Sequence, residues 1–394
     1  MKSLIWICGF IWSLAFPNNS LGQQISGVVL SGEEQAPLPG ANVLLVNTTI
    51  GTSTDVEGKF TLRGVPAGRF MLMVSYVGYE NLAVEIPVDG VNSYRLVLKP
   101  DPNFLDEVTV QERRRKKQQW LHHLALFTKY FVGEGEFAAA CTITNPEVLH
   151  FDKSGNKLSA YATEPVIIEN KALGYVIHYY LEYFDFDMAH YRINYDGYPA
   201  FKEMAPENED QKTAWLQARQ EAYKGSMMHF MRAFYNKKLV EEGFVLRAIE
   251  EEVNLKQEVR QVAAVGDTTV TYPQVFNKKH AEFYTQRYSS IMDTVNSTPE
   301  LPLLSFDKIL EVRFVGKKES YQYQRARRAS SQIGYDRPLT SFLTLLKPSV
   351  SVQSDGQFFP SKDIYCQGYW TWELMANALP LDYYPGGPTS IVDY

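Results

Sequence analysis

The chain has 394 residues and a formal net charge of −6, because 45 acidic side chains outnumber 39 basic ones. This acidic balance argues against a nucleic-acid-binding protein, which carries an excess of Lys and Arg. The length suits two domains, or one larger domain joined to a small one.

The first 22 residues are typical of a secretory signal peptide. Lys2 precedes an apolar run over residues 4–16, and Ser20 and Gly22 provide the small residues expected before a cleavage point. The run is shorter than the ~20 residues that a membrane-spanning helix needs, and no later run is long and apolar enough. We expect an exported chain that begins at Gln23, has no transmembrane span and, with 38 basic against 45 acidic residues, carries a net charge of −7.

Residues 25–98 alternate between apolar and polar side chains, as in the series Phe70, Leu72 and Val74. A period of two predicts half-buried strands. Turn sequences such as Pro39-Gly40 and Asp89-Gly90 separate the runs at short intervals. Six or so short strands without a helical pattern predict a small antiparallel β-sandwich over residues 23–99.

Five phrases within this stretch form a specific set. They are Ile25-Ser26-Gly27-Val28-Val29, Pro39-Gly40-Ala41-Asn42-Val43, Gly51-Thr52-Ser53-Thr54-Asp55, Gly58-Lys59-Phe60 and Val74-Ser75-Tyr76-Val77-Gly78-Tyr79. This set resembles the carboxypeptidase regulatory-like domain, a transthyretin-like or immunoglobulin-like sandwich. Such domains are non-catalytic parts of metallocarboxypeptidases and N-terminal extensions of TonB-dependent outer-membrane receptors. The resemblance implies this fold, no peptidase activity, and a location in the periplasm, at the outer membrane or at the cell surface.

Residues 100–118 combine prolines with a basic run, which predicts a linker that enters a helix. The basic run consists of Arg113, Arg114, Arg115, Lys116 and Lys117. A run of this kind is usually a solvated face, and the alternative is a contact with anionic lipid or with a partner. The apolar spacing from Trp120 to Phe131 indicates an amphipathic helix.

Residues 133–138 fit the spacing of a dinucleotide-binding fingerprint, Gly-x-Gly-x-x-Ala. That motif needs a strand before it, whereas a predicted helix precedes it here. Glu134 and Glu136 would also repel a pyrophosphate. We therefore interpret the two glycines as the end of a helix.

Residues 119–394 contain helices and strands in segregated runs, which predicts an α+β domain fused to the sandwich. A long helical pattern covers residues 212–239 with a break at Gly225, and a last helix is expected over residues 369–379. Cys141 and Cys366 remain after the leader is removed. An exported chain could bridge them or bury both as thiols, and the sequence leaves both alternatives open. Further strands are expected over residues 148–151, 157–162, 175–186, 191–201, 244–249, 309–315 and 342–346.

The sequence contains no recognisable catalytic or metal-binding motif. The seven histidines supply no His-Glu-x-x-His spacing, and the chain has no Gly-x-Ser-x-Gly, phosphate-binding Gly-x-x-x-x-Gly-Lys or Cys-x-x-Cys sequence. We therefore expect no catalytic residue, no metal and no cofactor.

One acidic and aromatic cluster remains as a candidate binding site. Carboxylates beside an aromatic face suit a glycan, and in a cleft with raised pKa values they would suit a hydrolase. On a regular strand Asp185 and Asp187 would share a face with Tyr183, and Glu182 would lie on the opposite face, so the carboxylates need not converge. The candidate residues are Tyr179, Glu182, Tyr183, Asp185, Asp187 and His190.

The sequence thus favours an exported, non-catalytic cell-envelope protein that binds a protein partner or a glycan. One alternative is a hydrolase that uses the carboxylates of residues 182–187. The other is an accessory component of TonB-dependent uptake across the outer membrane.

Overall fold

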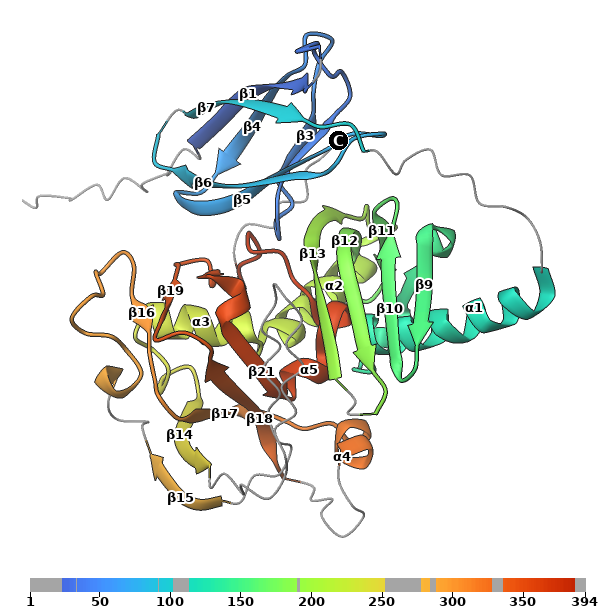
Figure 1. The fold of residues 1–394 in the computed structure, drawn as a ribbon. Helices are drawn as coiled ribbons and strands as arrows, with labels where there is room; N and C mark the ends of the chain where they lie inside the picture. Colours follow the sequence, from blue (N-terminus) through green and yellow to red (C-terminus); the bar gives the residue numbers. More distant parts are fainter. Residues whose placement is uncertain are drawn as a thin grey trace, which may run out of the picture. The chain divides into compact units, whose positions relative to one another are not determined.

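The chain divides into two compact units. A computed structural model describes residues 23–32, 34–90, 92–101, 113–189, 192–251, 278–283, 288–327 and 336–386. Unit 1 comprises residues 1–43 and 52–101, and unit 2 comprises residues 44–51 and 102–394 (Figure 1). The expected signal peptide, residues 1–22, lies outside the described residues.

The strands between residues 23 and 98, most of which belong to unit 1, form a sandwich of two sheets, as predicted. One sheet has the order β4-β1-β7, with β1 (Gln23–Ser31), β4 (Lys59–Val65) and β7 (Asn92–Leu98). The other has the order β3-β2-β5-β6, with β2 (Asn42–Leu45), β3 (Gly51–Ser53), β5 (Gly68–Ser75) and β6 (Leu82–Val88).

The expectation of a wholly antiparallel sandwich is wrong at one pair of strands. β1 and β7 run parallel, in register from Ile25 opposite Asn92 to Ser31 opposite Leu98. A parallel pair needs a long crossover, and the four strands of the second sheet lie between β1 and β7 in the sequence. Local alternation predicts that a strand forms but does not predict its direction relative to a partner distant in sequence.

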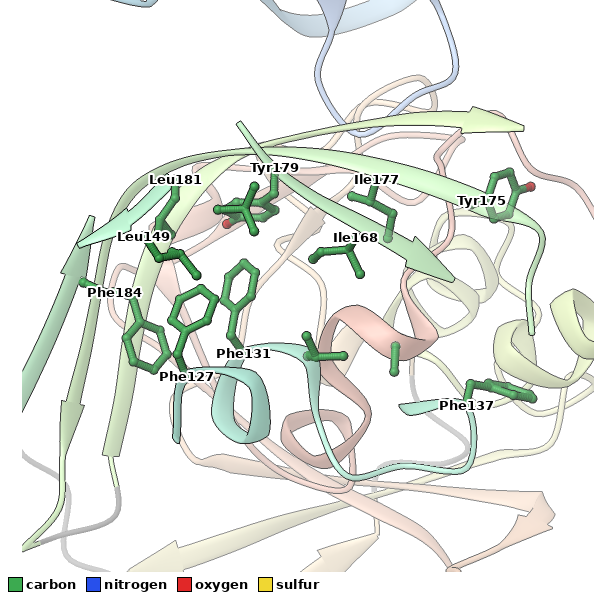
Figure 2. Close-up of a cluster of buried hydrophobic side chains, with 14 of the residues drawn as sticks. Phe127, Phe131, Phe137, Leu149, Ile168, Tyr175, Ile177, Tyr179, Leu181 and Phe184 are labelled. Atoms are coloured by element: carbon green, nitrogen blue, oxygen red, sulfur yellow. The ribbon is translucent and has the colours of Figure 1, made fainter. Parts of the chain in front are cut away.

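The first sheet of unit 2 is antiparallel and contains β8 (Cys141–Ile143), β9 (Leu149–Ser154), β10 (Lys157–Ala162), β11 (Val166–Asn170), β12 (Tyr175–Asp187) and β13 (Arg192–Glu203). Helix α1 (Arg113–Phe127) continues into a π-helical turn (Thr128–Val132). Phe127 and Phe131 from these helices pack against Tyr179 and Phe184 of β12 (Figure 2). Gly133, at a φ of 111°, ends the helix, which confirms its predicted role.

The second sheet of unit 2 has the order β15-β14-β17-β18-β21. Its strands are β14 (Phe244–Glu251), β15 (Lys278–Phe283), β17 (Ile309–Lys318), β18 (Pro338–Leu345) and β21 (Ile364–Gly368). A small sheet contains β16 (Leu303–Leu304), β19 (Val350–Val352) and β20 (Phe358–Phe359). The helices are α2 (Glu209–Tyr223), α3 (Met227–Tyr235), α4 (Tyr321–Arg327) and α5 (Trp370–Glu373), so the mixed content predicted for this region is present.

Two helix predictions have different outcomes. The break at Gly225 is confirmed, because this glycine has a φ of 77° and a Cβ there would lie 2.6 Å from the Phe314 ring. The last helix is shorter than predicted, since α5 ends at Glu373 and a 3₁₀ turn follows over Leu374–Asn377. Leu374 has a φ of 44°, which interrupts the helix and which the apolar spacing did not reveal.

The structure also shows where the basic run and the two cysteines lie. The backbone of residues 113–117 forms the first turn of α1 rather than a linker, and Lys117 is exposed. The side chains of residues 113–116 lie outside the described part. Cys141 on β8 and Cys366 on β21 are free thiols, and burial raises the pKa of each to about 12.

Candidate functional site

The candidate cluster lies on β12, whose pattern changes near its middle. Before this point Ile177 and Leu181 face the hydrophobic core, and after it Phe184 and Phe186 do so. The two sets are an odd number of residues apart, and the pairing of β12 with β13 shifts between Leu181 and Tyr183. This irregularity is a β-bulge, which accommodates one extra residue in one strand.

The bulge corrects the predicted placement of Glu182. A regular strand would put Glu182 on the same face as Phe184 and Phe186, but Glu182 and Tyr183 are both exposed. Asp196 on β13 pairs with Tyr183 and interacts electrostatically with Glu182. The bulge therefore brings Glu182 to the same side of the sheet as Tyr183. Regular alternation along the strand predicted that the two residues lie on opposite sides.

The solvent-facing side of strands β9, β10, β12 and β13 carries rows of paired residues, which we call the outer face. Their inward neighbours, such as Leu158, Phe184 and Tyr195, pack in the core. The outer face contains His150, Asp152, Lys157, Ser159, Tyr161, Glu182, Tyr183, Asp185, Asp187, Asn194 and Asp196.

An aromatic row crosses the outer face. The His150 and Tyr161 rings stack with centroids 4.9 Å apart and an interplanar angle of 17°. Ala160 pairs with Phe184 in this antiparallel sheet, so Tyr161, which follows Ala160, lies beside Tyr183, which precedes Phe184, on the same face. Tyr161 is 54% exposed and Tyr183 is 36% exposed, which leaves both rings open to solvent.

A row of hydrogen-bonding side chains lies beside the aromatic row, two residues further along each strand. Asp152 pairs with Ser159, Ser159 with Asp185, and Asp185 with Asn194. The Ser159 hydroxyl donates to Asp185 Oδ1 at 2.6 Å, and Lys157 Nζ lies 2.9 Å from Asp185 Oδ2. The Tyr183 hydroxyl lies 3.4 Å from Asn194 Oδ1 and links this row to the aromatic row. Asp187 Oδ1 accepts from the Ala189 N–H, within the same strand end.

Charged groups close the end of the outer face near the bulge. Lys362 Nζ lies 2.6 Å from Asp196 Oδ2. Partial burial raises the pKa of the Glu182 carboxyl, Asp196 raises it further, and Lys362 opposes the rise. The pKa of Lys362 is raised, chiefly by its hydrogen bond to Asp196. Asp196 and Lys362 could not be identified from the sequence, because only the fold places them beside Glu182.

The remaining predicted residues do not join this cluster. Tyr179 points into the core, where its ring centroid lies 4.8 Å from that of Phe131, and burial raises its pKa. His190 lies outside the described residues. Tyr161 and His150 were missed, although alternation within the predicted hairpin at residues 148–162 would have placed both on the polar face.

A second unusual carboxyl lies on α5. Glu373 is buried, and its burial raises its pKa to about 7. Lys317 Nζ lies 3.8 Å from Glu373 and 3.3 Å from Glu221, so one ammonium serves two carboxylates. Glu136 is near enough to raise the pKa of Glu373 further.

The described residues lack two features. They include no group of three or more His, Cys, Asp or Glu side chains arranged to hold a metal ion. Within the same residues, no helix is both long and apolar enough to cross a membrane.

The N-terminal stretch has related sequences in other proteins. Residues 25–110 match the family model of the CarboxypepD_reg-like domain. This part of the chain is a carboxypeptidase regulatory-like domain. TonB-dependent receptor P39 of Formosa agariphila is 38% identical to the chain over 110 residues, which are 28% of this chain and 10% of the receptor. TonB-dependent receptor SusC of Bacteroides thetaiotaomicron is 36% identical over 111 residues, which are 27% of this chain and 10% of the receptor.

The chain therefore spans about a tenth of the length of the receptors it matches. The relationship of the regulatory-like domain to theirs indicates a role associated with the cell envelope. Among solved structures, the pilus 2b backbone protein of group B streptococcus is similar to part of the chain. Its TM-score is 0.19 at 18% identity, covering 22% of this chain and 43% of that one.

Proposed function

We propose that the protein is an exported, non-catalytic component of the cell envelope that binds a neutral glycan chain on the outer face of unit 2. The supporting observation is the aromatic row of His150, Tyr161 and Tyr183 beside a row of hydrogen-bonding groups. The regulatory-like domain, shared with TonB-dependent receptors, supports the envelope setting.

The chemistry of a sugar chain matches both rows. The apolar face of a pyranose ring packs on an exposed aromatic ring, and its hydroxyls exchange hydrogen bonds with carboxylates, amides and hydroxyls. The sheet gives a chain several such places, spaced by the ~4.8 Å between neighbouring strands. Carboxylates outnumber basic groups on the outer face, so an acidic polysaccharide would be repelled.

A hydrolase at the same residues receives less support. Such an enzyme needs two carboxyls that face one glycosidic bond in a cleft. Asp185 is held by Ser159 and Lys157, whereas the raised pKa belongs to Glu182, which is exposed beside the bulge. These contacts fit a positioned binding surface better than an acid and base pair.

Affinity electrophoresis of the full mature chain tests the proposal. Gels containing dextran, laminarin or xylan supply neutral chains, and a gel containing alginate supplies an acidic one. We expect at least one neutral polysaccharide to retard the wild type. The double variant Tyr161→Ala, Tyr183→Ala should lose at least about 1.5 kcal/mol of binding free energy, because both stacking surfaces are gone.

Tyr321→Ala is the matched control, since Tyr321 on α4 is 55% exposed and lies outside the outer face. This variant should migrate like the wild type in every gel. Equal retardation of the wild type and the double variant would contradict the proposal, as would retardation by alginate alone or by no polysaccharide.

A role as an accessory of outer-membrane uptake is a second candidate. It is favoured by the receptors that carry the same type of domain, SusC among them. Affinity purification of the tagged full chain from cross-linked native envelopes should then enrich a TonB-dependent receptor. A variant lacking residues 25–98 should fail to do so, and equal enrichment by both chains would contradict a role for the regulatory-like domain.

A further inference from the structure

A pocket of about 330 Å³ lies in unit 2, at the end of β12 remote from the bulge. It is lined by Tyr175 at the start of β12, Glu203 at the end of β13, helix α2, the segment from Pro380 to Gly386, and Thr49, whose N–H donates to Asp382 Oδ1 at 3.0 Å. Its volume is near the lower end of the range for small-molecule sites. The pocket shares no lining residue with the outer face, so it is an independent site.

One wall is a polar stripe of α2. Thr213, Gln217 and Gln220 follow the spacing i, i+4 and i+7, which places them on one side of a helix. Leu216 lies between them and adds an apolar contact. The side chains of the three polar residues form no hydrogen bond within the described part of the chain. Each amide can donate and accept, and the hydroxyl can do both.

A buried arginine holds the opposite side. Arg219 donates from Nε to the Leu173 carbonyl at 2.7 Å and from a terminal nitrogen to the Gly174 carbonyl at 3.2 Å. Its other terminal nitrogen lies 2.7 Å from Glu203 Oε1, and its guanidinium lies 4.0 Å from the centroid of the Tyr175 ring. These contacts pair the guanidinium of Arg219 and fix the side chains of Glu203 and Tyr175 in the pocket.

A second buried arginine fixes the C-terminal wall. Arg232 donates to the carbonyls of Leu381 at 2.9 Å and Tyr383 at 2.8 Å. Its guanidinium lies 4.2 Å from the centroid of the Tyr384 ring, and its Nε donates to the Asp355 carbonyl at 2.8 Å. Two charged groups thus hold the walls in place before a ligand arrives, which lowers the entropy cost of binding.

The balance of charged groups in the pocket indicates which class of ligand it can bind. Arg219 is matched by Glu203, and Asp382 adds a further carboxylate, so no unpaired cation is offered to an anion. Burial raises the pKa of the Tyr175, Tyr383 and Tyr384 phenols, which keeps the three rings neutral at ordinary pH. Neutral amides, hydroxyls and aromatic rings together suit a small polyhydroxyl compound.

We infer that this pocket binds one neutral monosaccharide-sized polyol, with its hydroxyls on Gln217 and Gln220 and its apolar face against the rings of Tyr383 and Tyr384. The site does not depend on glycan binding by the outer face.

Saturation-transfer NMR and calorimetry on the full mature chain test the inference. The probes are D-glucose, D-galactose, D-mannose and N-acetyl-D-glucosamine, with D-glucuronate as an anionic comparison. We expect at least one neutral sugar to bind, and glucuronate to bind more weakly than it. Gln217→Trp, which fills the pocket from an exposed helical position, should weaken that binding at least about tenfold.

Two control variants separate this site from other effects. Ala214→Trp adds the same indole to an exposed position of α2 that does not line the pocket, and it should bind like the wild type. The outer-face variant Tyr161→Ala, Tyr183→Ala should also keep its monosaccharide affinity. The inference is overturned if no neutral sugar binds, if Gln217→Trp binds as tightly as Ala214→Trp, or if glucuronate is preferred.

Discussion

The two units differ in what their interiors contain. Among the described residues of unit 1, the buried polar side chains are the hydroxyls of Ser31 and Thr54. Unit 2 buries charged groups, including Arg219, Arg232 and Glu373. A buried charge is tolerated only when nearby groups compensate for its lost hydration.

This difference shows two ways of specifying a fold. In unit 1, a buried polar side chain bonds to backbone nearby in sequence, as at Thr54, whose Oγ1 accepts from the Ala41 N–H at 2.8 Å and donates to the Leu38 carbonyl at 2.5 Å. In unit 2, Arg232 joins backbone that is more than 120 residues away in sequence. Substitutions of single side chains can therefore test whether the two units are stabilised in these two different ways.

The largest effect should come from Arg232→Leu. This change leaves three carbonyls, those of Asp355, Leu381 and Tyr383, without their donor. Because an unsatisfied buried acceptor costs about 1–3 kcal/mol, we expect unfolding of unit 2 to become easier by about 4 kcal/mol or more. Hydrogen exchange read by mass spectrometry, peptide by peptide, measures the loss in each unit of the intact chain.

The control for this change is Arg325→Leu, since Arg325 is exposed on α4. Arg325→Leu should leave protection unchanged, and peptides from unit 1 should be unaffected by either substitution. Equal loss of protection in both units after Arg232→Leu would remove the distinction drawn between them.

A smaller, pH-dependent effect should follow from Glu373→Gln. The pKa of this carboxyl is raised from 4.5 to about 7 in the folded chain, mainly by burial. The folded state therefore holds the proton more tightly than the unfolded state. The contribution of this group to stability is greatest below about pH 4.5 and is lost as the pH rises through about 7. The loss amounts to as much as about 3 kcal/mol, and the variant should not show it.

Denaturant unfolding followed between pH 4 and pH 8 measures this dependence. Glu134→Gln is the control, because Glu134 is exposed and pairs with Lys129 at 3.2 Å. That variant should keep the wild-type slope. A Glu373→Gln chain with the same slope as the wild type would show that Lys317 compensates the buried charge fully.

The smallest effect belongs to unit 1. Thr54→Val keeps the shape of the side chain but removes its hydrogen bonds to Ala41 and Leu38. We expect a cost of about 1–2 kcal/mol, confined to unit 1. Thr52→Val, at the half-buried middle of the nearby strand β3, should change little, because the Thr52 hydroxyl has only a weak contact of 3.4 Å with the next carbonyl. Thermal melting monitored by exchange in unit 1 distinguishes the two.

The sequence predicted the elements well where their cause is local. Alternation placed the strands of unit 1, the hairpin of β9 and β10 and the long strands β12 and β13. It did not predict the parallel pairing of β1 with β7 or the irregular backbone at Leu374, which depend on distant packing.

The candidate site was predicted only in part for the same reason. Tyr183, Asp185 and Asp187 could be assigned to one face by counting, but Asp196 and Lys362 join them only through pairing across the fold. The pocket left one trace in the sequence, the polar stripe of Thr213, Gln217 and Gln220. That stripe has the same pattern as an ordinary solvated side of a helix, so no rule of spacing could distinguish it.

The bulge in β12 has a consequence for how this surface can vary. If Glu182 were removed, inward and outward side chains would alternate regularly over residues 175–186, and every core side chain would still face inward. Glu182 thus behaves as an inserted residue that the interior does not require. Substitutions at this position should therefore leave the core packing unchanged, so the outer face can vary there while the scaffold is kept.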